Sequence, residues 1–186
     1  MVTPASSGTT PAQRVREAVE PAVRAAGLHL EDVVVAPAGR RTVVRVVVDL
    51  DDDAIGSLDL DAVGDVSREI SAALDAADPV RGVYVLEVST PGTDRPLTEL
   101  RHFRRARTRL VRLALRDGSS LTGRLVEAEA DRYVLDPAPD GVAQRTTLDP
   151  AQVARGHVEV ELHRLGTHDE DADGATDAHD DEEGPA

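Results

Sequence analysis

The most chemically distinctive stretch of this sequence is residues 95–116, which hold eight arginines and a single acid, Glu99. Guanidinium groups bind phosphates and carboxylates through pairs of parallel hydrogen bonds, so this stretch suits a nucleic acid backbone or an acidic protein surface. The same arginines could instead pair with the acidic first half of the chain and hold two domains together. Six of them are our candidates for contact with a partner: Arg95, Arg101, Arg104, Arg105, Arg107 and Arg112.

A hydrolase triad is a second chemistry that the residue types allow, because Ser89, Asp94 and His102 lie close together in the sequence. A Gly-x-Ser-x-Gly turn, which exposes the nucleophile in many serine hydrolases, is absent from the sequence. A serine at the end of a strand more often caps a turn. We therefore predict that the chain is not an enzyme.

The aspartates at 49 and 51–53 suggest a calcium loop, but their spacing argues against one. An EF-hand loop that begins at Asp49 needs glycine at its sixth position and glutamate at its twelfth, where this chain has Ala54 and Leu60. Cysteine is absent, and the sequence contains no glycine-rich nucleotide loop. We expect a solvated acidic loop here, and no metal, cofactor or small-molecule substrate.

Charge is distributed very unevenly along the 186 residues, whose net charge is −14. Residues 1–97 carry 9 Arg against 16 Asp and Glu, residues 98–165 carry 12 against 10, and residues 166–186 carry none against 9. Only three aromatic residues are present, Tyr84, Phe103 and Tyr133, so recognition of single-stranded bases by stacking is not expected. Without a signal peptide pattern or a long apolar run, we expect a cytoplasmic protein that does not contact membranes.

The first half of the chain predicts the element order α-β-β-α-β. Thr10, Pro11 and Gln13 mark the start of a helix that ends at Gly27, and Pro21 should kink it or divide it into two pieces. Alternating apolar residues predict strands over 28–36, 41–50 and 83–89, and a helical stripe predicts a second helix that ends before Asp78. The pattern is typical of an α+β domain with helices on one sheet face.

The second half predicts a short helical connector over 98–104, followed by strands at short intervals. The expected strands cover 109–116, 121–125, 131–135, 145–148 and 157–162. Five short strands in so few residues are typical of a small closed barrel. Beyond Gly166 no core-forming pattern remains, which predicts an acidic disordered tail.

The segment 86–97 connects these two halves. It begins as a β-branched strand and stops at a Pro-Gly pair, which favours a turn. Asp94 and Arg95 could each pair across this corner, so we expect it to be stiff. The residues of this interdomain signature are Ser89, Pro91, Gly92, Asp94, Arg95 and Pro96.

The segment 86–97 also resembles the signature of the bacterial ribosome maturation factor RimP family, which reads L-E-V-S-S-P-G-x-D-R-P-L. Upstream, residues 58–61 with 66–71 are similar to the family's T-L-D-D and V-S-R-x-I-S, and residues 20–23 with 26–28 match a third motif that includes Pro21. The three motifs occur in family order. The departures are small, such as Thr90 in place of serine.

The resemblance implies a non-enzymatic factor that binds the immature small (30S) ribosomal subunit, through rRNA or through the ribosomal protein of the decoding centre. It also implies that the second domain is an SH3-like, Sm-related barrel. We accordingly divide the chain into a disordered start (1–10), an α/β domain (11–97), the barrel (98–165) and the tail (166–186), and expect a monomer. An Sm-like RNA-binding regulator without a ribosomal role is the alternative.

Overall fold

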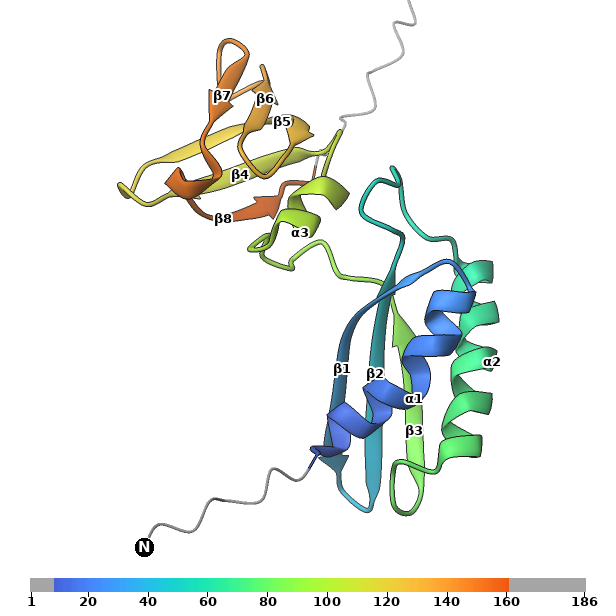
Figure 1. The fold of residues 1–186 in the computed structure, drawn as a ribbon. Coiled ribbons are helices and arrows are strands. Elements are labelled where there is room, and N and C mark those ends of the chain that lie inside the picture. The colour runs from blue at the N-terminus through green and yellow to red at the C-terminus, as the bar shows by residue number, and fades with distance from the viewer. Residues whose placement is uncertain (1–8, 161–186) are drawn as a thin grey trace, which may run out of the picture.

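The computed structural model describes residues 9–160 and shows a mixed α+β chain with two separate sheets and two separate hydrophobic cores (Figure 1). The predicted disordered tail, 166–186, lies outside the described residues, and so do residues 1–8 of the predicted disordered start. Thr10 from that start is the N-cap of the first helix. The division of the chain into domains stays a prediction.

Helix α1, Pro11–Ala25, begins where the sequence predicts. Thr10 and Gln13 form a capping box in which each side chain accepts a hydrogen bond from the other residue's backbone N–H, at 3.2 and 2.8 Å. Pro21 lies inside the helix without dividing it, so one of the two outcomes expected for this proline, a split into two pieces, does not occur. Pro21 is exposed, and the backbone carbonyl that loses its partner there can be hydrated.

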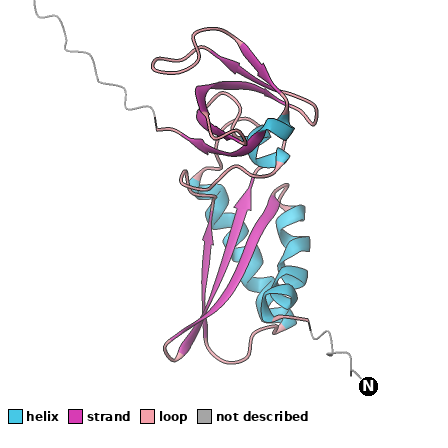
Figure 2. Cartoon of the chain, turned by 90° about the vertical axis from the view of Figure 1, so that its left-hand side faces the viewer, coloured by secondary structure: helices cyan, strands magenta, loops and turns pink. Residues whose placement is uncertain are grey.

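The remaining elements of the first half are β1 (His29–Ala38), β2 (Arg41–Asp49), α2 (Leu60–Ala77) and β3 (Tyr84–Ser89). This is the predicted order α-β-β-α-β. The sheet order is β1-β2-β3, with β1 antiparallel and β3 parallel to β2. Helix α2 is the crossover that a parallel pair requires, and both helices pack on the same face of the sheet (Figures 1 and 2).

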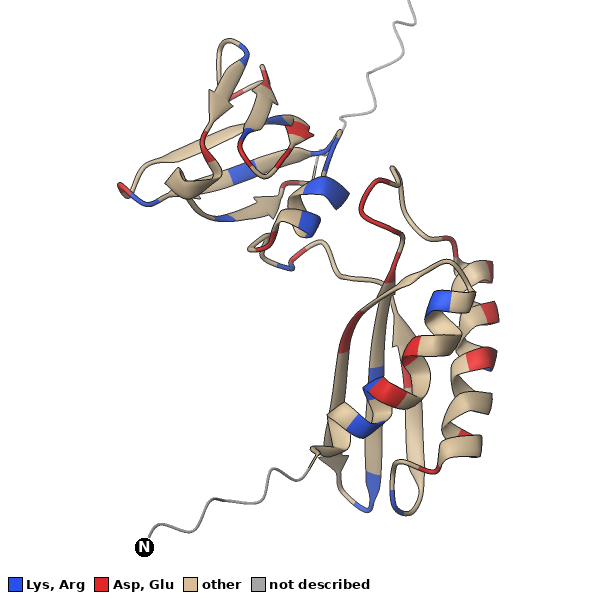
Figure 3. Cartoon of the chain, in the orientation of Figure 1, with Lys and Arg blue, Asp and Glu red and all other residues tan. Residues whose placement is uncertain are grey.

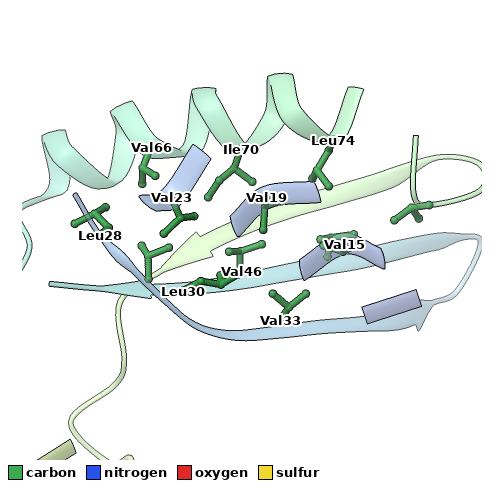
Figure 4. Close-up of a cluster of buried hydrophobic side chains, with 13 residues drawn as sticks. Val15, Val19, Val23, Leu28, Leu30, Val33, Val46, Val66, Ile70 and Leu74 are labelled. Atoms are coloured by element: carbon green, nitrogen blue, oxygen red, sulfur yellow. The ribbon is translucent and has the colours of Figure 1, made fainter. Parts of the chain in front are cut away.

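The core of the first half is made largely of valine. Val44, Val46 and Val48 alternate along β2 and are fully buried under α1 and α2. Val19 and Ile70 meet them from the two helices (Figure 4). The opposite sheet face is partly open, as the sequence predicts, with Val34 at 40% exposure.

A β-bulge interrupts the pairing of β1 with β2 at Glu31. Leu30 pairs with Val48 and Asp32 with Val47, so Glu31 has no partner on β2. Leu30 and Val33 are three residues apart and would point to opposite faces of a regular strand, yet the bulge places both on the buried face. The bulge therefore keeps the core face apolar and releases the Glu31 side chain toward the second half of the chain.

The second half contains α3 (Leu100–Arg105) and five strands around a short 3₁₀ helix, η1. The sheet order is β7-β6-β5-β4-β8. The bounds are Leu110–Leu115 for β4, Ser120–Ala128 for β5, Tyr133–Asp136 for β6, Thr146–Leu148 for β7, Pro150–Gln152 for η1 and Val153–Val158 for β8.

Two expectations for this half need correction. Within residues 9–160 the strands β7 and β8 are the two edges of the sheet and do not pair, so the sheet is open where a closed barrel was predicted. The last strand within the described residues is β8, Val153–Val158, which begins before the predicted strand 157–162, and residues 161 and 162 lie outside the described part of the chain. Strand β8 starts directly after η1, which follows β7 through the single residue Asp149, and Val160 is 67% exposed.

The second core includes a stacked pair of rings, Phe103 from α3 and Tyr133 from β6, whose centroids are 4.5 Å apart. Leu97 packs in this core too, and its backbone exchanges two hydrogen bonds with Gly156 of β8, at 2.7 and 2.8 Å. A side chain at Gly156 would press on Leu113 and Phe103, because its Cβ would lie 3.0 Å from each of them. None of the described helices is long and apolar enough to cross a membrane.

Candidate functional site

Helix α3 carries much of the arginine cluster toward the first half of the chain. In Figure 3 its blue segments face the red loop that joins β2 to α2. The helix is anchored from behind by Phe103, which is 3% exposed in the second core. The residues on the other side of α3 therefore lie between the two halves of the molecule.

His102 on α3 is buried, and hydrogen bonds to both ring nitrogens fix its orientation. Its Nδ1 accepts from the backbone N–H groups of Thr98 and Glu99, both at 3.2 Å, so the proton belongs on Nε2, which donates to Glu31 Oε1 at 3.2 Å. Burial and the nearby Arg95 charge lower the pKa of His102, although Glu31 and Glu99 act in the opposite direction. The contact with Glu31 is therefore a hydrogen bond from a neutral ring.

Glu31, the bulge residue of β1, is the centre of an ion-pair network between the halves. Its carboxylate lies 2.7 Å from Arg95 Nη2 and 3.0 Å from Arg101 Nη2, in addition to the His102 contact. Its side chain is only 10% exposed. A carboxylate this buried requires compensating cations, and these are Arg95 at the corner between the halves and Arg101 of the second half.

Arg101 joins this network to the loop after β2. Its Nη1 lies 3.0 Å from Asp52 Oδ1, and its side chain is 11% exposed. The charges are close, but the N–H groups are not aligned for hydrogen bonding with either carboxylate, and Nε, Nη1 and Nη2 are all buried without a hydrogen-bond partner. Arg101 therefore contributes through charge, without the directional bonds that its neighbours make.

Arg105 makes the most complete set of contacts across the interface. Its Nε and Nη2 donate to the two carboxylate oxygens of Asp49 at 3.1 and 2.8 Å, a bidentate pair. Nη2 also donates to the Gly56 carbonyl at 3.0 Å, and Nη1 donates to the carbonyl of Ala54. The side chains of Arg105 and Asp49 are 8% and 12% exposed.

Two further arginines bind the same loop of the first half. Arg107 Nη2 donates to the Asp53 carbonyl at 2.9 Å, and lies 3.9 Å from the Asp53 carboxylate. Arg109 Nη2 donates to Ser57 Oγ at 2.9 Å. The loop 50–59 is thus fastened to the second half through both its backbone and its side chains.

The two remaining candidates face away from the interface. Arg104 pairs with Glu129 at 3.0 Å, and Arg112 pairs with Glu159 at 2.8 Å, both within the second half. Among the six candidates, the structure therefore brings Arg95, Arg101, Arg105 and Arg107 together against the first half. Arg101, Arg105 and Arg107 pair between the halves, the alternative open from the sequence, and Arg95 pairs with Glu31 at the corner that joins them.

The interdomain signature forms the corner between the two halves. Ser89 is the last residue of β3, and the Arg95 N–H closes a turn on the Gly92 carbonyl at 3.2 Å. Arg95 pairs across the corner, as expected, whereas Asp94 makes no ion pair with any described residue. The hydrogen bonds of the His102 ring go to Glu31 and to residues 98 and 99, so the structure assembles no Ser89–His102–Asp94 triad.

A cavity of about 220 Å³ opens between the halves at this corner. The signature segment lines one side through residues 90–93 with Arg95, the loop after β2 lines another through Ser57 and Leu58, and α3 and Arg109 complete the wall. No group of three His, Asp or Glu within residues 9–160 is placed to hold a metal ion.

Reasoning from the sequence missed the acidic partners of the arginines, above all Glu31. The sequence around Glu31 reads as an ordinary strand, and a bulge leaves no clear mark in the amino-acid pattern. Asp49 and Asp52 belong to the loop that the sequence predicts to be solvated, but Asp49 is largely buried against Arg105. A usable signal was the charge difference between the two halves of the chain.

Comparison with known proteins gives the same family as the sequence motifs. The family description "RimP N-terminal domain" matches residues 18–94. Ribosome maturation factor RimP of Kineococcus radiotolerans is 48% identical over 158 residues, which cover 78% of this chain and 76% of that protein. The chain belongs to the RimP family.

Two further members of the RimP family are longer than this chain. Ribosome maturation factor RimP of Frankia casuarinae is 53% identical over 149 residues, covering 74% of this chain and 54% of that protein. The corresponding Parafrankia sp. protein is 43% identical over 177 residues, covering 80% and 56%. The chain therefore spans about half the length of these two RimP proteins.

Proposed function

We propose that this chain is a maturation factor for the small (30S) ribosomal subunit, and that it acts in the cytoplasm by binding and not by catalysis. The observation that carries the proposal is membership in a family whose related proteins are named ribosome maturation factor RimP. The buried arginine network supports it, because its residues are engaged in holding two halves of the protein together.

The six arginines then divide into two roles. Arg95, Arg101, Arg105 and Arg107 set the relative pose of the two halves, and Arg104 and Arg112 are the candidates for direct contact with rRNA or a ribosomal protein. Arg112 is 60% exposed, and its Glu159 partner is on the surface as well. A surface pair of this kind exchanges partners at little cost when a phosphate approaches.

We also propose how the chain divides into domains and what kind of sheet the second domain contains. We assign residues 11–97 to an α/β domain and residues 98–165 to a second domain whose strongly bent sheet is SH3-like. Gly123 on β5 supports tight bending, because a side chain there would lie 3.0 Å from the Asp136 carbonyl and from Leu135. The separate cores support two domains.

Sedimentation of cell extracts tests the proposed function directly. We expect the full-length protein to migrate with immature small subunits, and we expect a strain that lacks it to accumulate unprocessed rRNA precursor and fewer mature small subunits. A normal subunit profile in the deletion strain would overturn the proposal. Binding to RNA without migration alongside subunits would favour the Sm-like regulator.

Two neighbouring charge reversals separate the two roles of the arginines. Arg104→Glu should weaken subunit binding and reduce its salt dependence, with a smaller loss of stability than Arg105→Glu because its partner Glu129 is 45% exposed. Arg105→Glu should lower stability, because it places a second carboxylate against buried Asp49. If Arg104→Glu binds the subunit as well as the unmodified protein does, Arg104 is not part of the contact surface.

A further inference from the structure

The cavity at the corner between the two halves contains an arginine, Arg109, that no carboxylate of the described residues neutralises. Arg109 donates to Ser57 Oγ at 2.9 Å and forms no ion pair with any residue in the range 9–160. Every other arginine that reaches the first half from residues 95–107 lies within 4.0 Å of an acid. The charge of Arg109 is thus available to a ligand inside the cavity.

Arg95 offers a second set of donors in the same cavity. Its Nη2 is bound to Glu31 at 2.7 Å, and no described residue accepts from its Nε or Nη1. Arg105 also lines the cavity, but all three of its nitrogens already donate to the first half, and they neutralise Asp49, the acid in the cavity wall. The uncompensated positive charge in the cavity therefore comes from Arg109, and Arg95 adds guanidinium donors that no described residue occupies.

The rest of the lining combines hydroxyl groups with an apolar wall. Ser57, Thr90 and Thr93 contribute hydroxyls from two separate segments, and the apolar side includes Leu58 and Val158. Guanidinium and hydroxyl donors that come from several directions suit a tetrahedral oxyanion with three or more acceptor oxygens better than a planar carboxylate. A volume of about 220 Å³ leaves room for a sugar-sized body beside the anion.

We propose that this cavity binds the phosphate group of a sugar phosphate, with Arg109 and Arg95 as its cationic contacts and the corner residues Thr90 and Thr93 as hydroxyl donors. The sugar phosphate is either a small free molecule or one unit of an RNA backbone. Both halves of the chain contribute to the site, so occupancy would stabilise their relative pose. The inference does not depend on a role in ribosome maturation.

Calorimetric titration of the full chain tests this site with three probes: inorganic phosphate, ribose 5-phosphate and a short single-stranded RNA. The variant is Arg109→Gln, and the matched control is Arg155→Gln, an exposed arginine on β8 outside the cavity lining. We expect Arg109→Gln to weaken binding of ribose 5-phosphate about tenfold, the effect of losing one charge-assisted hydrogen bond. Arg155→Gln should leave that binding unchanged.

The three probes distinguish the sources of the phosphate. Binding of ribose 5-phosphate with loss in Arg109→Gln identifies a small-molecule site, and binding of RNA alone, with the same loss, identifies a backbone phosphate. If no probe binds, or if Arg109→Gln and Arg155→Gln weaken binding equally, the proposal is wrong. Should Arg109→Gln not fold, Thr93→Val removes only a hydroxyl and should still weaken binding.

Failure of this test and failure of the proposed function can be told apart. The titration uses purified protein and no ribosomal particle, whereas sedimentation measures association with subunits and needs no free phosphate. If the chain migrates with immature subunits but binds none of the probes, the proposed function stands and the proposed phosphate site is wrong.

Discussion

The arginines at the interface and those on the outer surface of the second half differ in their surroundings and not in their chemistry. Arg101 and Arg105 are 11% and 8% exposed against acids of the first half. Arg112 and Arg132 are 60% and 51% exposed, and their acids, Glu159 and Glu127, are also partly exposed. In these four pairs, burial of the arginine together with its carboxylate separates an arginine that determines architecture from one that remains available to a partner molecule.

This contrast predicts how much each arginine contributes to stability. Removing one member of a buried pair leaves an uncompensated charge in a poorly hydrated place, whereas removing one member of an exposed pair leaves a charge that water can solvate. Replacing an interface arginine should therefore lower stability strongly, and replacing a surface arginine should lower it little.

Arg105→Ala should produce the largest loss of stability. It removes four hydrogen bonds and leaves Asp49, which is 12% exposed, without its cation. We expect the free energy of unfolding to fall by about 3 kcal/mol, measured by urea denaturation. Arg112→Ala is the control, and equal losses in the two variants would contradict the comparison.

Glu31→Gln should have the second largest effect, a fall of about 2 kcal/mol in the free energy of unfolding. The amide keeps the shape of the side chain but removes the negative charge that faces Arg95 and Arg101. Asp52 still partly compensates Arg101, so the loss is smaller than for Arg105→Ala. The matched control is Glu87→Gln, which removes a surface carboxylate that pairs with Arg45 on the open sheet face.

Acidification should weaken the interface through His102. Its folded-state pKa is lowered, chiefly by burial and then by Arg95, so the unfolded chain binds this proton more readily. The stability that comes from the neutral ring is complete above about pH 6.5 and is lost as the pH falls from there toward the folded-state pKa. His102→Asn should flatten the dependence of stability on pH below about pH 6.5, and an unchanged slope would exclude His102 as its source.

Arg132→Gln should have the smallest effect. Arg132 pairs with Glu127 at 2.9 Å on the surface of the second half. We expect a change in the free energy of unfolding that is smaller than that of Glu31→Gln and that shrinks further in high salt. A loss close to that of Arg105→Ala would show that exposure is not what separates the two groups of arginines.

Much of the fold follows from local patterns in the sequence. The capping box of Thr10 and Gln13, the alternating valines of β2 and the stop of α2 before Pro79 are short-range signals, and each is confirmed. Pro21 shows the limit of such signals, because tertiary packing of Val19 and Val23 keeps α1 continuous across it.

The sequence predicted less of the candidate site than of the fold. The position of the arginine cluster is evident, but its partners lie far away in the chain: Glu31 is 71 residues from His102, and Asp49 is 56 residues from Arg105. A closed barrel was wrongly predicted because strand number and spacing do not determine whether the two edge strands pair. These features depend on tertiary register, which the local pattern does not encode.

The most direct test of the account is the distance between the two halves in solution. The chain has no cysteine, so Arg40→Cys in the β1–β2 turn and Ala154→Cys on β8 would carry two spin labels for pulsed electron resonance. With the interface intact, we predict one narrow distance distribution, which broadens when Arg105→Ala and Glu31→Gln are added. A broad distribution with the interface intact, or no change in the combined variant, would contradict the claim that these buried ion pairs fix the pose.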